Sequence, residues 1–172
     1  MPADGDTKKA WFLHDAVAHA ALIEIGRISH LGACMMTGLL PREMTVAQYA
    51  VLFVMQSAER PMKITQIADL MHVSQPTMSS TVRKLERKQL VKIVPSTTDR
   101  RAKHVELTEL GVAVKQECDA SVSPDLNSIA STLTSEEWKQ MAPILKKLRR
   151  SYVAALADTN FVDRDMMPPT SS

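Results

Sequence analysis

The segment that most constrains the fold of this 172-residue chain runs from residue 64 to residue 111. Its first part, ITQIADLM, repeats apolar residues at three- and four-residue spacing, which is typical of a short helix that packs on a core. A turn at His72 and Val73 follows. Ser74 and Pro76 are suited to the N-cap and the first turn of a second helix. The segment therefore begins as a helix-turn-helix.

The second helix has an apolar side and a polar side. Met78, Val82 and Leu85 share the apolar side, whereas the polar side begins with short hydrogen-bonding groups and continues into long cations. A helix in the major groove of DNA needs this gradient, because small donors and acceptors reach base edges while cations meet phosphates. We predict base contacts from Gln75, Thr77, Ser79 and Ser80, and phosphate contacts from Arg83, Lys84 and Arg87.

A hairpin is expected after the second helix. The strand-like run at 90–94 and the alternating run at 103–107 enclose a polar loop at 95–101. Thr108 is placed to cap a further helix, and residues 62–63 are a candidate edge strand beside the hairpin. Helix, turn, helix and hairpin in this order predict a winged helix-turn-helix.

Positive charge is concentrated in the same segment. Residues 83–104 hold eight Lys or Arg and two acids, a net charge of +6, whereas the whole chain has 21 basic and 19 acidic residues, a net charge of +2. A basic helix and loop can be merely a solvated surface, but this asymmetry, together with the order of the elements, favours DNA binding. Arg100 and Lys103 of the hairpin and Thr65, where the N-terminus of a helix favours an anion, join the predicted DNA contacts.

The segment resembles the MarR family (multiple antibiotic resistance regulators), which are winged-helix transcription factors. The resemblance rests on DRR at 99–101 and VELTELG at 105–111, which match the family's D-x-R…L-T-x-x-G wing and helix start, and it extends over about residues 10–158. It implies that Arg101 enters the minor groove and that Asp99 orients it.

One departure from the family concerns base reading. Many members carry an arginine where this chain has Ser80, so the resemblance does not transfer an operator sequence.

The expected fold is mainly α with a small β-hairpin wing. Capping boxes at 45–48 and 134–137 start two helices, and Pro124 is expected to break or kink a helix that begins near residue 109. The predicted organisation is a single unit at 8–158, with dimerisation helices at 8–40 and 109–158, a DNA-binding region at 45–108, and flexible tails at 1–7 and 159–172.

The terminal helices have more apolar surface than one small winged domain can cover. A homodimer is the simplest way to bury this surface. Two-fold symmetry would also place two recognition helices roughly one DNA turn apart, which matches a pseudo-palindromic operator with half-sites about 10 bp apart.

Enzymatic and membrane functions find no support in the sequence. There is no HExxH, no GxSxG and no glycine-rich phosphate loop, so we expect no catalysis and no cofactor. No apolar run approaches the roughly 18 residues of a membrane span, and no signal peptide is visible, so a cytoplasmic protein without a membrane partner is expected. No metal site is expected either, although zinc could be held by a set drawn from His14, Glu24, His30 and Cys34.

The resemblance also implies a small-molecule effector. Family members respond to phenolic or aromatic acid compounds that bind between the dimerisation helices and the winged domain. Polar or soft groups on the first helix are the candidate contacts, although packing at the core and its rim explains them equally well. These candidates are His14, Arg27, His30, Cys34 and Met35.

Two alternatives stay open. The regulator could sense oxidation through Cys34, although both cysteines, Cys34 and Cys118, are expected to be buried thiols in a reducing compartment. The winged helix could instead dock proteins without touching DNA. The basic cluster argues against docking, because a docking wing does not require that charge.

Overall fold

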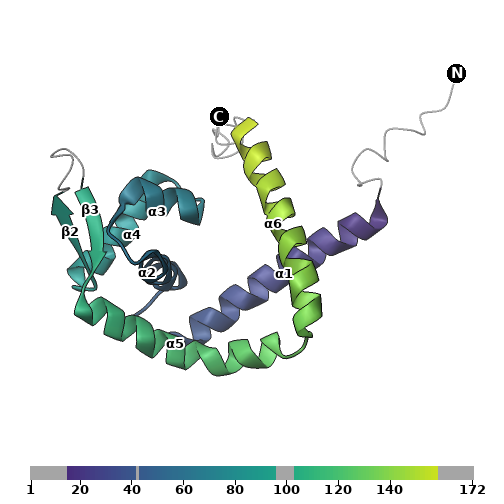
Figure 1. Cartoon of the computed structure of the whole chain (residues 1–172), viewed down its shortest axis with the longest axis horizontal. Coiled ribbons are helices and arrows are strands. Elements are labelled where there is room, and N and C mark those ends of the chain that lie inside the picture. The colour runs from purple at the N-terminus through teal and green to yellow at the C-terminus, as the bar shows by residue number, and fades with distance from the viewer. Residues whose placement is uncertain (1–14, 42, 96–102, 159–172) are drawn as a thin grey trace, which may run out of the picture. The chain divides into compact units, whose positions relative to one another are not determined.

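The computed structural model of the chain describes residues 15–41, 43–95 and 103–158. Within these residues six helices and three short strands follow one another (Figure 1). Their bounds are α1 Ala16–Leu39, α2 Val46–Ala58, β1 Met62–Lys63, α3 Ile64–Met71, α4 Gln75–Arg87, β2 Val91–Pro95, β3 Lys103–Leu107, α5 Glu109–Ala130 and α6 Ser135–Asp158. This is the predicted fold class, a mainly helical chain with a small antiparallel sheet.

The sheet has the strand order β1-β3-β2, with β3 in the centre. β1 pairs with β3 through Met62 and Val105, which confirms the expected edge strand. β2 pairs with β3 from Val91 opposite Leu107 to its last residue, Pro95. We had expected Pro95 in the loop. It is tolerated in β2 because an edge strand does not need every amide for pairing.

The apolar side of α4 anchors the helix to the core. Met78, Val82 and Leu85 are at most 3% exposed, which confirms the predicted inward side. α2 and α3 lie beside the β2–β3 hairpin (Figure 1), and α4 packs among these elements. Their buried side chains that share this core with α4 include Val51, Leu52, Met55, Ile67, Val91 and Val105.

Hydroxyl side chains cap the starts of four helices at the positions predicted from the sequence. The acceptors are the hydroxyls of Thr45, Ser74, Thr108 and Thr134, and the donors are the amides of Gln48, Thr77, Gly111 and Glu137. Both capping boxes are complete, because the side chains of Gln48 and Glu137 accept from the cap residue's own amide. These bonds satisfy amides that have no partner inside the helix.

The first helix begins later than expected. We had placed its start near residue 8, but the Asp15 carboxylate accepts from the amides of Val17 and Ala18 at 2.9 and 3.1 Å. Asp15 is therefore the N-cap, and α1 begins at Ala16. The part of the prediction that covers residues 8–14 lies outside the described residues.

We had expected a break or a kink at Pro124, and the break is wrong, because α5 continues through this residue to Ala130. Proline removes one amide donor from the helix. The hydroxyl of Ser123 donates to the Asp119 carbonyl at 2.6 Å, so a side chain supplies an additional hydrogen bond beside that position.

The chain divides into two compact units at Pro124. In the second unit, the indole of Trp138 donates to the Ala130 carbonyl at 2.9 Å, which ties the start of α6 to the end of α5. No described helix is long and apolar enough to cross a membrane.

The long terminal helices leave apolar side chains in contact with solvent. α1 buries none of its residues, and its Ile28 and Leu31 are 67% and 66% exposed. On α6, Ile144 is 65% exposed and Leu156 is 58% exposed. Each helix therefore presents an apolar face that the single chain does not cover.

Gly111 is required by a close backbone approach. A Cβ at this position would overlap the carbonyl oxygen of Leu90, which also accepts from the Thr108 amide at 3.2 Å. The first turn of α5 can therefore pack against the end of the helix-turn-helix only with glycine here.

We predict that Gly111→Ala lowers the free energy of unfolding by about 2–4 kcal/mol, because backbone must move to admit the methyl group. Thermal or urea unfolding measures the loss. Gly38→Ala is the matched control: nothing lies within 4 Å of its Cβ position, and alanine favours helix, so the control should be neutral or more stable. Equal losses in the two variants would contradict the packing argument.

Candidate nucleic-acid interface

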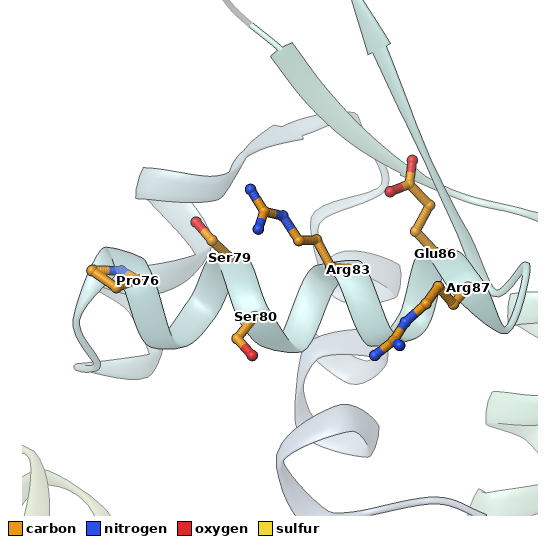
Figure 2. A pocket seen from close by; sticks show the side chains of 6 residues that line it. All are labelled: Pro76, Ser79, Ser80, Arg83, Glu86 and Arg87. Atoms are coloured by element: carbon orange, nitrogen blue, oxygen red, sulfur yellow. The ribbon is translucent and has the colours of Figure 1, made fainter.

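The polar side of α4 forms a continuous stripe on the surface of the first unit. Figure 2 shows Ser79, Arg83 and Glu86 along one edge of the helix and Ser80 and Arg87 along the other. With Pro76 at the N-terminal end, these six side chains line a pocket of about 710 Å³. The pocket belongs to one helix face, opposite the core contacts of Met78, Val82 and Leu85.

The predicted base-reading residues all lie on the outward side. Gln75, Thr77 and Ser80 are exposed, and Ser79 is half-buried. The hydroxyl of Thr77 lies 2.8 Å from the hydroxyl of Ser74, so it already takes part in the helix cap. Gln75 and Ser80 are therefore better placed than Thr77 to reach a base edge.

The cations predicted to meet phosphates are also exposed. Arg83, Lys84 and Arg87 point away from the core, and Lys103 is exposed on β3. At the start of α3, Thr65 is exposed. The remaining predicted contacts, Asp99, Arg100 and Arg101, lie outside the described residues.

Two cations of the basic cluster have partners within the protein. The Lys88 ammonium donates to the Gln48 carboxamide at 3.2 Å and to the Glu43 carbonyl oxygen. Lys92 pairs with Glu106 on the neighbouring strand at 2.9 Å. The charge that faces outward is therefore smaller than the sequence suggests.

Two residues of the stripe were not among the contacts predicted from the sequence. Pro76 was assigned only to the helix start, and Glu86 was counted only as one of two acids among the cations. Pro76, Ser79, Arg83 and Glu86 are separated by three or four residues, which is the spacing of one helix face. That spacing was the available signal.

A second polar cluster joins α2 to α5. The hydroxyl of Tyr49 donates to Asp119 at 2.8 Å, and the Lys115 ammonium pairs with the same carboxylate at 2.6 Å. Lys115 is only 8% exposed, and its ammonium lies 5.0 Å from the centre of the Phe53 ring. The buried cation thus has both a counter-charge and an aromatic partner.

Burial, the hydrogen bond to Asp119 and the charge of that carboxylate together raise the pKa of Tyr49 to about 12, with burial the largest cause. The neutral phenol is the form that the fold prefers. The α2–α5 contact therefore depends on the phenol proton of Tyr49, which stays bound at a higher pH than in an ordinary tyrosine.

The two cysteines differ in their surroundings. Cys118 is fully buried, and this burial raises the pKa of its thiol. Cys34 is exposed on α1, with its sulfur 3.7 Å from Nε2 of His30, so the expectation that both thiols are buried is wrong. The cause is that α1 buries none of its residues within the chain.

The predicted effector contacts that the structure describes all lie on α1. Arg27 pairs with Glu24 at 2.6 Å on the exposed surface of α1, Met35 is half-buried, and His14 lies outside the described residues. A cavity of about 360 Å³ instead lies beside the α1–α2 connection. It is lined by Pro41, Glu43, Met44, Lys88, Leu90, Leu110, Val114 and Glu117.

Metal binding finds no candidate group in the part of the chain that the structure describes. No three His, Cys, Asp or Glu side chains there are placed to hold an ion.

Comparison with known proteins identifies relatives of this architecture. A family model of the MarR family matches residues 43–102, from the α1–α2 connection to the residue before β3. The structure is similar to the transcriptional regulator BldR from Sulfolobus solfataricus, with a TM-score of 0.69 and 22% identity over 81% of this chain and 99% of the other.

Two further relatives were solved with bound molecules. A mutant of MarR from Escherichia coli in complex with operator DNA matches with a TM-score of 0.63 and 25% identity, over 74% of this chain and 95% of that one. The PcaV regulator from Streptomyces coelicolor, in complex with its natural ligand, matches with a TM-score of 0.66 and 22% identity, over 84% of this chain and 99% of that one.

The Tyr49 hydrogen bond generates a test that depends on pH. Because the pKa of Tyr49 is about 12 in the folded chain and about 10 when unfolded, its contribution is complete below pH 10 and is lost as the pH rises from about 10 to about 12. Tyr49→Phe should cost about 1–2 kcal/mol at pH 7 and should flatten this alkaline loss. Urea unfolding across the pH range measures both effects. An unchanged alkaline slope in Tyr49→Phe would show that other groups cause it.

Proposed function

We propose that the chain is a winged-helix regulator of the MarR family that binds operator DNA as a homodimer and represses transcription until a small-molecule effector releases it; the match to the family model and the shared fold support this. The observation that carries the proposal is the outward stripe of α4. A helix whose polar groups precede its cations, held rigidly by an apolar opposite side, fits the major groove. A regulator of this kind would act on the chromosome, in the cytoplasm.

The roles of the stripe follow from its chemistry. Gln75 offers both a donor and an acceptor, and Ser80 a hydroxyl, at the end of α4 that would enter the groove. Arg83, Lys84 and Arg87 lie farther along and would bind the phosphates on either side. Phosphate contacts hold the register, whereas base contacts select the sequence.

The uncovered apolar faces of α1 and α6 support the homodimer. Burying side chains such as Ile28, Leu31 and Ile144 against a second copy would remove a large apolar area from water, at roughly 25 cal/mol per Å². A two-fold dimer would present one α4 to each half-site of an inverted repeat. Size-exclusion chromatography with light scattering tests the dimer directly.

The central experiment measures binding to DNA. DNA fragments selected by the purified protein from a random pool should compete far better than random duplex, and their binding should weaken steeply with salt. If no fragment is enriched, and binding to all duplexes is weak, the winged helix docks another kind of molecule instead.

Substitutions on the stripe should separate base reading from phosphate binding. Arg87→Ala should weaken binding to all duplexes alike and lower the salt slope by about one, whereas Gln75→Ala should weaken binding to the selected DNA more than to random DNA. Titrations at several salt concentrations measure both effects. Lys139→Ala, which removes an exposed cation from α6, is the control and should change neither. Identical losses for the two stripe variants would contradict the division of roles.

The effector site that we propose is the 360 Å³ cavity beside Lys88. Its size suits a single aromatic ring, and Met44, Leu90 and Leu110 offer an apolar wall. Glu43 and Glu117 also line it, so a phenol, which is neutral and can donate to a carboxylate, fits better than an aromatic acid. An effector that binds preferentially to dimers with wrongly spaced recognition helices lowers the affinity for DNA by linkage.

Oxidation of Cys34 is the competing trigger, because its thiol is exposed beside His30. The two triggers are separated by Cys34→Ser. The proposed mechanism predicts that phenol weakens operator binding equally in the wild type and in Cys34→Ser. Release by peroxide in the wild type, lost in Cys34→Ser and unaccompanied by any response to phenol, would assign the regulation to oxidation instead.

A further inference from the structure

The stripe on α4 contains one side chain of the wrong charge for DNA. Glu86 lines the same pocket as Arg83 and Arg87, and its carboxylate extends from the same edge of the helix as Ser79 and Arg83 (Figure 2). It is exposed, so solvent and DNA can reach it. A carboxylate in this position would repel the phosphates that its neighbours attract.

The local fold gives no stabilising reason for this carboxylate. Glu86 lies in the last turn of α4, where an acid opposes the helix dipole and where Lys84 and Arg87 are the favourable charges. Among the described residues Glu86 forms no ion pair, and its backbone carbonyl, not its side chain, accepts from the Gln89 amide. Met78, Val82 and Leu85 hold the helix in place without it.

We propose that Glu86 is a specificity determinant that disfavours binding to random DNA. The inference rests on the proposed function, that α4 binds DNA. Binding to random DNA depends almost entirely on attraction between cations and phosphates. The repulsion between the Glu86 carboxylate and the phosphates therefore acts fully on this binding. At the operator, base contacts from the other end of α4 fix one register, in which the Glu86 carboxylate is held away from the phosphates. Glu86 therefore lowers the affinity for random DNA more than the affinity for the operator, and the ratio of the two affinities rises.

The test compares wild type with Glu86→Gln on random duplex and on duplex selected by the wild-type protein. Glu86→Gln should bind random duplex about threefold to tenfold more tightly and with a salt slope steeper by about one, while its affinity for the selected duplex rises less. The ratio of the two affinities should fall. Glu86→Asp, which keeps the charge, should keep the wild-type ratio.

A second control removes a carboxylate from an element outside the motif. Asp125→Asn makes the same change in net charge on α5, where Asp125 is exposed, and should leave the ratio unchanged. Thermal unfolding confirms that each variant is folded; Glu86→Gln should be at least as stable as the wild type, because the acid opposes the helix dipole.

Three outcomes overturn the inference. They are unchanged affinity for random duplex in Glu86→Gln, equal gains in Glu86→Gln and Asp125→Asn, and a loss of affinity for the selected duplex alone, which would make Glu86 a reader of bases. If the wild type enriches no sequence, sequence-specific regulation fails. A gain on random duplex would then show only that Glu86 faces DNA, and the specificity role would be rejected with it.

Discussion

The burial of one side of α4 is the constraint on which the rest of the molecule depends. Met78, Val82 and Leu85 enter the core formed by α2, α3 and the sheet, and this fixes the rotation of the helix about its axis. A helix held in that way has only one set of residues that can face outward. The position of every polar group on the stripe is therefore a consequence of three apolar contacts, and a change in the core would turn the stripe as a whole.

The helix-turn-helix and the hairpin were predictable because their signals are local. Apolar spacing, hydroxyl caps and the alternation of the returning strand each depend on a few neighbouring residues, and the structure agrees with them. The break expected at Pro124 was wrong, because the missing amide donor removes a single hydrogen bond from α5 and the helix continues on both sides of it. The start of α1 was misplaced because Asp15 can be read as a helical residue or as a cap.

The charges of the candidate site were harder to predict than its position. The sequence counts Lys88 and Lys92 with the other cations, but their partners, Gln48 and Glu106, come from segments distant in sequence or from another strand. The spacing of Glu86 from Arg83 already places both residues on one face of the helix, but the predicted contacts included only the cations of that face. The exposed Cys34 likewise depends on how little of α1 the chain itself covers. Local patterns thus identify which helix would bind, whereas contacts distant in sequence decide which side chains are available.

The inward placement of Lys88 and the pairing of Lys92 have a consequence for the thermodynamics of association. Counterions are released from DNA according to the number of cations that reach phosphates, not the number in the chain. Lys88 stays bound to neutral oxygens of its own protein, and Lys92 carries its own counter-charge. For the DNA binding proposed above, the entropy gained from released ions would accordingly be smaller than the composition implies, and direct contacts with the bases would supply a larger share of the binding free energy.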